Sequence, residues 1–244
     1  LVSPGSNAGA NLGSLIIDRN TDQDFNGNGV IDPGTLEDGN GKFYVGNAVP
    51  CFTPGILIAT PMGEVAVELL REGDRVITRD NGVQKIAWAG TKVLSGGELA
   101  ANPQMQPVLI KAGALGDGNP ARDLLVSPNH RILVSNIRPA LLFGEQEVLV
   151  AAQYLVDGKG ILRVTTNRMS YIHFMFTEHQ VVLSEGAWTE SFQPGVLSLK
   201  GIGQAQRAEI MTLFPELEDA DGLQAYHSAR KSLKRHEARL LRTR

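Results

Sequence analysis

From residue 51 to about residue 192 the sequence is a succession of short segments rich in β-branched residues, bounded by Gly, Pro, Asn or Asp. Asn81-Gly82 separates two of these segments and is a strong hairpin signal, because both residues tolerate positive φ. Leu94–Pro107 is a polar interruption that we expect to be a loop or an insertion. The pattern predicts an all-β domain over residues 51–192. The expected strands are Ile56–Thr60, Val65–Leu69, Arg75–Thr78, Gln84–Ala89, Val108–Lys111, Leu124–Val126, Arg131–Val134, Glu147–Val150, Leu162–Thr165, Ser170–Phe176 and His179–Leu183.

The period changes after residue 195. Gln204–Phe214 spaces its apolar residues three apart and meets Pro215, as expected for a helix and its stop. Leu223–Leu241 is predicted to be a second amphipathic helix, with basic residues on the face opposite its apolar stripe. Residues 193–244 are therefore predicted to form a C-terminal helical extension.

The net charge of −3 conceals an uneven distribution, since residues 1–50 are acidic and residues 226–244 are basic. A basic tail can bind nucleic acid. The tail lacks interleaved aromatic residues, so we interpret it as the solvated face of a helix and do not expect nucleic-acid binding. No apolar run reaches about 18 residues, and no transmembrane span is expected.

The acidic, Gly/Asn-rich segment of residues 1–50 contains a loop, residues 24–38, that resembles the start of an EF-hand or dockerin-type calcium loop. Position 12 is Thr35 where a bidentate acid belongs, and Pro33-Gly34 would break the exiting helix. The loop is thus a candidate Ca²⁺ site, and the alternative is a plain Asn/Gly/Asp turn cluster. The candidate ligands are Asp24, Asn26, Asn28 and Asp32.

Cys51, at the boundary between the acidic segment and the β domain, is the only cysteine. A single cysteine excludes an internal disulfide and a thiolate zinc site. It is either a small buried hydrophobic residue or a nucleophile. At the start of a domain it could attack the carbonyl of Pro50, an N-to-S acyl shift that converts the Pro50–Cys51 amide into a thioester. Such a shift needs a proton for the leaving nitrogen and hydrogen-bond donors at the carbonyl.

Ser127-Pro128-Asn129-His130 places a hydroxyl and a histidine at a corner between two predicted strands. Ser127 could orient the scissile carbonyl or the imidazole ring, and His130 could donate a proton to the leaving nitrogen. The alternatives are a hydroxyl that bonds its own turn and a histidine that merely packs. Pro50 adds the option of a cis Val49–Pro50 bond.

These residues carry a family resemblance. Cys51-Phe52-Thr53-Pro54-Gly55, followed by Gly63 and Gly73-Asp74, resembles the first motif of the Hint (hedgehog/intein) autoprocessing domain. Ser127-x-x-His130 is similar to the Thr-x-x-His motif of that family, and Tyr171–Val182 with His179 resembles its last strand pair. The resemblance covers about residues 51–192 and is strongest to the bacterial hedgehog/intein-like subfamily. It implies a pseudo-twofold all-β horseshoe with Cys51 at its centre, and self-cleavage through a thioester.

The sequence departs from the family at the end of the domain. Inteins end in His-Asn, because the Asn side chain cyclises, but here no Asn is present and Glu190 stands where the His would be. We therefore expect neither Asn cyclisation nor splicing. Glu98 and Asp117 are the positional candidates for the acid that hedgehog proteins use. The upstream segment is expected to be released or transferred, with water, a thiol, an amine or a hydroxyl as the acceptor.

The predicted catalytic residues are Cys51, His130, Ser127 and His179, the scissile bond is Pro50–Cys51, and the chemistry requires no cofactor. His173 is interpreted as a packing residue and Asp123 as an ion-pair or turn residue. The alternative function is an inert Hint scaffold that serves as a calcium-dependent adhesion module. With either function we expect a bacterial protein that is secreted or displayed at the cell surface.

Overall fold

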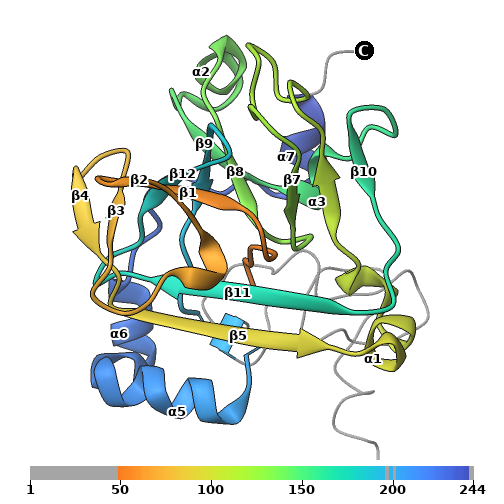
Figure 1. Ribbon diagram of the computed structural model, residues 1–244. Helices are drawn as coiled ribbons and strands as arrows, with labels where there is room; N and C mark the ends of the chain where they lie inside the picture. Colours follow the sequence, from red (N-terminus) through yellow and green to blue (C-terminus); the bar gives the residue numbers. More distant parts are fainter. Residues whose placement is uncertain (1–48, 196–197, 200–201, 242–244) are drawn as a thin grey trace, which may run out of the picture. The chain divides into compact units, whose positions relative to one another are not determined.

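The strands predicted between residues 51 and 192 are present and form four sheets (Figure 1) in the computed structural model, which describes residues 49–195, 198–199 and 202–241. These residues belong to one structural unit, Gly46–Arg244. The predicted calcium loop at residues 24–38 lies outside the described residues. The all-β class predicted from the sequence is confirmed.

The largest sheet has six antiparallel strands. Its hairpin β12–β13 is central, and Thr189 of β13 faces Ile132 of β8. This register places the neighbouring Glu190 beside Arg131. In spatial order the strands are β2 (Gly63–Ala66), β1 (Leu57–Thr60), β12 (Val181–Ser184), β13 (Ala187–Glu190), β8 (Arg131–Val134) and β9 (Val148–Ala151).

Three smaller sheets complete the β structure. The longest strands, β5 (Trp88–Leu94) and β11 (Met169–Met175), pair along their full length and lie side by side in Figure 1. β3 (Arg75–Ile77) and β4 (Val83–Lys85) form the hairpin predicted from Asn81-Gly82, and Gly82 has a φ of 63°. The remaining sheet has the order β10 (Ile161–Arg163), β6 (Val108–Ile110) and β7 (Leu124–Val126).

The C-terminal region is helical, as predicted, but its second helix is interrupted. The first prediction corresponds to α5 (Gln204–Leu213). The predicted helix at Leu223–Leu241 is instead two short helices, α6 (Ala220–Ala225) and α7 (Arg235–Leu240). The chain between them is non-helical, because Lys231 O and Leu233 N bond to Leu149 of β9.

Several elements lie where the sequence predicted none. The polar interruption at Leu94–Pro107 contains α1 (Gly96–Ala101), whose capping box joins Ser95 and Glu98. The other unpredicted elements are most of β5, β13, α2 (Ile137–Phe143), α3 (Ala152–Leu155) and the 3-10 turns η2 (Pro103–Met105) and η3 (Pro215–Glu218). The predicted strand Val65–Leu69 ends early, and its second half is the 3-10 turn η1 (Val67–Leu69).

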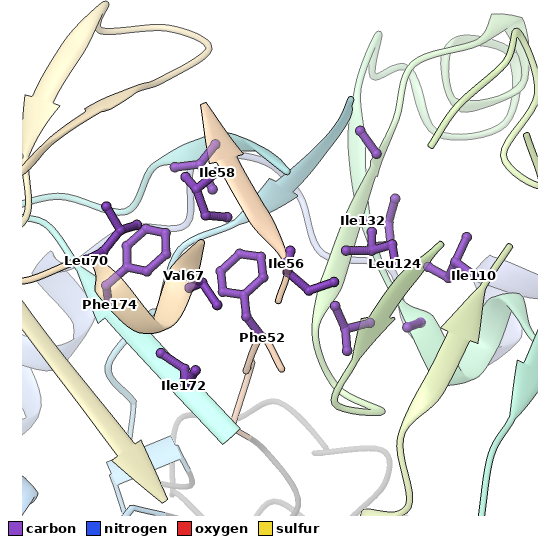
Figure 2. Close-up of a cluster of buried hydrophobic side chains, with 14 of the residues drawn as sticks. Phe52, Ile56, Ile58, Val67, Leu70, Ile110, Leu124, Ile132, Ile172 and Phe174 are labelled. Atoms are coloured by element: carbon purple, nitrogen blue, oxygen red, sulfur yellow. The ribbon is translucent and has the colours of Figure 1, made fainter. Parts of the chain in front are cut away.

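Phe52, the residue after the predicted nucleophile, lies in the main hydrophobic cluster (Figure 2). Its ring stacks on Phe174 at 5.4 Å between centroids and meets the edge of the His130 ring at 4.4 Å. Burying a side chain of this size contributes roughly 1.5–3 kcal/mol. The same packing therefore stabilises the fold and fixes the backbone next to Cys51.

Among the residues described, no helix has the length and apolar character needed to cross a membrane.

Candidate active site

The chain at Cys51 and Phe52 passes in extended form between β7 and β11 (Figure 1). Phe52 N donates to Ile172 O and Ile172 N donates to Phe52 O, both at 2.9 Å. On the other side, Ser127 N donates to Cys51 O at 3.0 Å. The Pro50–Cys51 peptide bond is thereby held beside His173 of β11 and beside Ser127, which follows β7.

Ser127 holds the nitrogen of this peptide bond. Cys51 N donates to Ser127 Oγ at 2.9 Å, and Ser127 Oγ donates to Val49 O, also at 2.9 Å. The sequence predicted that Ser127 would orient the carbonyl or the imidazole ring, whereas the hydroxyl contacts the nitrogen. Asn119–Pro120 is the one cis peptide bond in the described ranges, so the Val49–Pro50 bond is trans.

His173 holds the carbonyl of the same peptide bond. Its Nδ1 lies 3.3 Å from Pro50 O, and because that oxygen only accepts, the contact is a hydrogen bond when Nδ1 carries the proton. The ring contacts Trp88 and Phe192, whose rings also contact each other, and its Nε2 has no hydrogen-bond partner in the described part of the chain. Burial lowers the pKa of His173 to about 4, so the ring is neutral at pH 7.

The Cys51 thiol lies alongside this bond, 97% buried, and donates to Val49 O at 3.2 Å. Burial raises the pKa of the thiol well above its ordinary value, although Ser127 and Lys92 oppose the shift. The thiol is therefore protonated at neutral pH and must lose its proton as it attacks.

The His130 ring packs against Phe52, the residue after Cys51. The backbone of this histidine is fixed by hydrogen bonds from His130 N to Ser127 O and from Ala152 N to His130 O. Neither ring nitrogen has a hydrogen-bond partner in the described part of the chain. Burial lowers the pKa of His130 to about 4, so this ring is also neutral at pH 7. A neutral imidazole has one nitrogen that donates and one that accepts, as a proton shuttle requires.

His179, the fourth predicted catalytic residue, contacts a different set of groups. Its Nε2 lies 3.2 Å from Ser191 O and 3.4 Å from Glu190 Oε2, and its Nδ1 accepts from Ala229 N at 3.0 Å. None of these contacts involves the scissile peptide.

The structure thus places Ser127 and His173 against the Pro50–Cys51 peptide bond, and the His130 ring against Phe52, the residue after Cys51. Sequence reasoning interpreted His173 as a packing residue. The sequence feature that could have drawn attention to His173 is its alternation with Tyr171 and Met175, which places all three on the same buried face of β11.

The remaining acidic candidates have structural contacts. Asp123 Oδ1 accepts from Ala112 N at 2.9 Å, and Glu98 caps α1. Asp117 lies in a turn with a φ of 51°. Within the described ranges no cluster of three His, Cys, Asp or Glu side chains could hold a metal ion. The four candidate calcium ligands, Asp24, Asn26, Asn28 and Asp32, lie outside those ranges.

Residues 50–196, more than half of the chain, match the family profile of the Hint domain. The chain therefore belongs to the Hint domain family, and the resemblance stated from the motifs is confirmed. The comparison with curated proteins finds no match.

Solved structures of intein-like domains are also similar to this chain. A bacterial intein-like domain from Clostridium thermocellum is 13% identical with a TM-score of 0.39, over 58% of this chain and 97% of that one. A DnaB intein from Synechocystis sp. PCC 6803 is 11% identical with a TM-score of 0.35, over 58% of this chain and 98% of that one.

Proposed function

We propose that this chain is a self-processing domain that cleaves the Pro50–Cys51 peptide bond through a thioester on Cys51. The observation that carries the proposal is that one buried peptide bond is held at both ends. His173 lies at its carbonyl oxygen and Ser127 holds its nitrogen, while the Cys51 thiol lies alongside. A structural cysteine does not require this arrangement.

The proposed step balances without a cofactor. The Cys51 sulfur attacks the Pro50 carbonyl carbon, the S–C bond forms and the C–N bond breaks. The thiol proton is lost and the Cys51 nitrogen gains one, so the net change is a proton transfer from sulfur to nitrogen. Neutral His130 accepts the first proton and supplies the second.

Two other groups stabilise this step. A His173 Nδ1–H donor bonds more strongly to the carbonyl oxygen as that oxygen gains negative charge. The Ser127 hydroxyl, already bonded to the Cys51 nitrogen, keeps that nitrogen aligned as it becomes an amine. The thioester then passes the upstream segment to water, a thiol, an amine or a hydroxyl.

Release without splicing is part of the proposal. The residue at the position of the intein His is Glu190, which is fully buried in β13, and no Asn follows it. The chain therefore has no Asn side chain there to cyclise.

Thiol-induced cleavage tests the proposal. The purified chain is incubated with dithiothreitol, which captures thioesters, and its intact mass is followed over time. The expected products are residues 1–50 as a thioester adduct and a fragment that begins at Cys51. Cys51→Ala protein, treated in the same way, should keep its full mass. If both proteins retain their full mass indefinitely, the proposed function is wrong.

A further inference from the structure

Glu190, at the end of β13, is a carboxylate with no exposed surface. Burying an ionised carboxylate costs several kcal/mol unless partners compensate for its lost hydration. Neither the fold nor the proposed transfer of protons between sulfur and nitrogen accounts for it. Its position in the sheet, beside Arg131, places it one residue from His130 along the neighbouring strand.

One oxygen of this carboxylate is held firmly. Glu190 Oε1 accepts from Arg131 N at 2.7 Å and lies 3.2 Å from Arg131 Nε. The other oxygen, Oε2, lies 3.4 Å from His179 Nε2, within ion-pair range but without a hydrogen bond. Burial alone would raise the pKa of Glu190, but Arg131 and His179 outweigh it and hold the pKa below its ordinary value. Glu190 is therefore ionised at neutral pH.

The C-terminal segment of residues 228–232 orients both partners of Glu190. Ala229 N donates to His179 Nδ1 at 3.0 Å, and since an amide nitrogen only donates, the ring carries a proton on Nε2, which lies 3.2 Å from Ser191 O and 3.4 Å from Glu190 Oε2. Ser232 Oγ accepts from Arg131 Nη1 at 2.5 Å. The carboxylate is thus supported by Arg131 of β8, by His179 just before β12, and by a segment more than 30 residues further along the chain.

The charge of Glu190 acts on His130, and it also contributes to the raised pKa of the Cys51 thiol. The ring nitrogens of His130 are fully buried and have no hydrogen-bond partner in the described part of the chain. Glu190 from β13, Arg131 from β8, His173 from β11 and His179 influence it electrostatically. Burial and the three nearby basic groups lower the pKa of His130, and among these four neighbours only the negative charge of Glu190 raises it.

We propose that Glu190 is a positioning residue that acts through His130, by supplying a fixed, buried negative charge that favours the protonated ring during proton transfer to the Cys51 nitrogen. This inference rests on the proposed function and deepens it. The residue at the position of the intein His would then serve the first step of the reaction, not a cyclisation that this chain cannot perform.

The test compares Glu190→Gln with wild type in two measurements. The ring titration of His130 is followed by NMR in a Cys51→Ala background, where no cleavage occurs. Loss of the charge should move the titration to lower pH. The pH profile of dithiothreitol-induced cleavage, measured with Cys51 present, should move in the same direction. Above the titration midpoint, the cleavage rate should fall about tenfold if the midpoint of His130 moves down by about one on the pH scale.

Glu185→Gln is the matched control. Glu185 is also buried, accepts from Leu57 N at 2.6 Å and pairs with Arg122, but it lies in the turn after β12. This substitution should lower stability and leave the His130 titration in place. Glu190→Asp, which keeps the charge, should restore part of the wild-type titration pH.

The two proposals fail in different ways. If wild type does not cleave, the proposed function is wrong, and the NMR titration still reports the influence of Glu190 on His130. If folded Glu190→Gln protein titrates at the wild-type pH, the inference is overturned. If Glu190→Gln does not fold, Glu190→Asp is used in its place. The shorter side chain moves the negative charge away from His130, so the ring of His130 should titrate at a lower pH than in wild type. An unchanged titration in that variant also overturns the inference.

Discussion

At the scale of single residues, His173 is the side chain that most changes the interpretation of the site. Its Nδ1 lies 3.3 Å from the Pro50 oxygen, whereas the sequence suggested that Ser127 would orient either that carbonyl or the imidazole ring of His130. Ser127 instead bonds the nitrogen. The two ends of the scissile bond are therefore held by residues from different sheet regions.

Replacing His173 by Phe tests this assignment. Phe keeps an aromatic ring beside Trp88 and Phe192 but cannot donate to the carbonyl oxygen. Loss of one preorganised donor of this kind typically slows the chemical step by about 10²–10³-fold. We expect a slowing of this order in dithiothreitol-induced cleavage, followed by intact mass. His227→Phe, at an exposed position, should cleave at the wild-type rate. Equal cleavage rates in wild type, His173→Phe and His227→Phe would show that His173 has no role in the reaction.

The motif residues and His173 differ in how they could be recognised from the sequence. Cys51, Ser127 and His130 lie in short local patterns with a chemical rationale. His173 acquires its role only because the chain at Cys51 passes beside β11, a contact between segments about 120 residues apart. The alternation along β11 predicts that His173 is buried but does not reveal what it faces.

At the scale of elements, the segment after α6 departs most from the sequence prediction. Its amphipathic pattern favours a helix over Leu223–Leu241, yet residues 231–233 bond to Leu149 of β9. Local helix propensity is worth only tenths of a kcal/mol per residue, so tertiary hydrogen bonds and burial override it. β13 was missed for a related reason. From the sequence alone Glu190 is expected at the surface, because its partners Arg131 and His179 are not its neighbours in the chain.

The different burial of two leucines in the C-terminal segment allows a test of how this segment is anchored. Leu233 is 5% exposed and packs with Val148 and Val150, while Leu240 is 55% exposed. Leu233→Ala should lower the free energy of unfolding by about 2–5 kcal/mol, since it leaves a cavity. Leu240→Ala should change it by less than about 0.5 kcal/mol. Urea unfolding measures both, and equal effects would show that the segment is not packed on β9 in solution.

At the scale of the whole molecule, the two buried histidines link stability to pH. Burial lowers the pKa of both His130 and His173 to about 4, from an ordinary value near 6.5. Between these values the unfolded chain binds more protons than the folded chain. The free energy of unfolding should therefore be highest above pH 6.5 and fall as the pH drops toward 4, by on the order of 3 kcal/mol for each histidine.

Urea unfolding at pH 7.0, 5.5 and 4.5 checks this dependence. Carboxylates also titrate near the lower end of the range, so the comparison with His173→Phe isolates the histidine contribution. That variant should lose less stability over the same interval, because one of the two groups is gone. A variant with the same slope as wild type would contradict the buried, neutral state of His173.

The central claim is that the acyl group of Pro50 is transferred from the nitrogen to the sulfur of Cys51. Hydroxylamine tests it most directly, because it converts a thioester into a hydroxamic acid on the acyl residue. We predict that wild-type protein yields a fragment of residues 1–50 that carries the hydroxamate on Pro50, together with a fragment that begins at Cys51, both located by tandem mass spectrometry. Cys51→Ala protein should yield neither. Absence of the Pro50 hydroxamate from wild-type protein, or its equal formation without Cys51, would contradict the account.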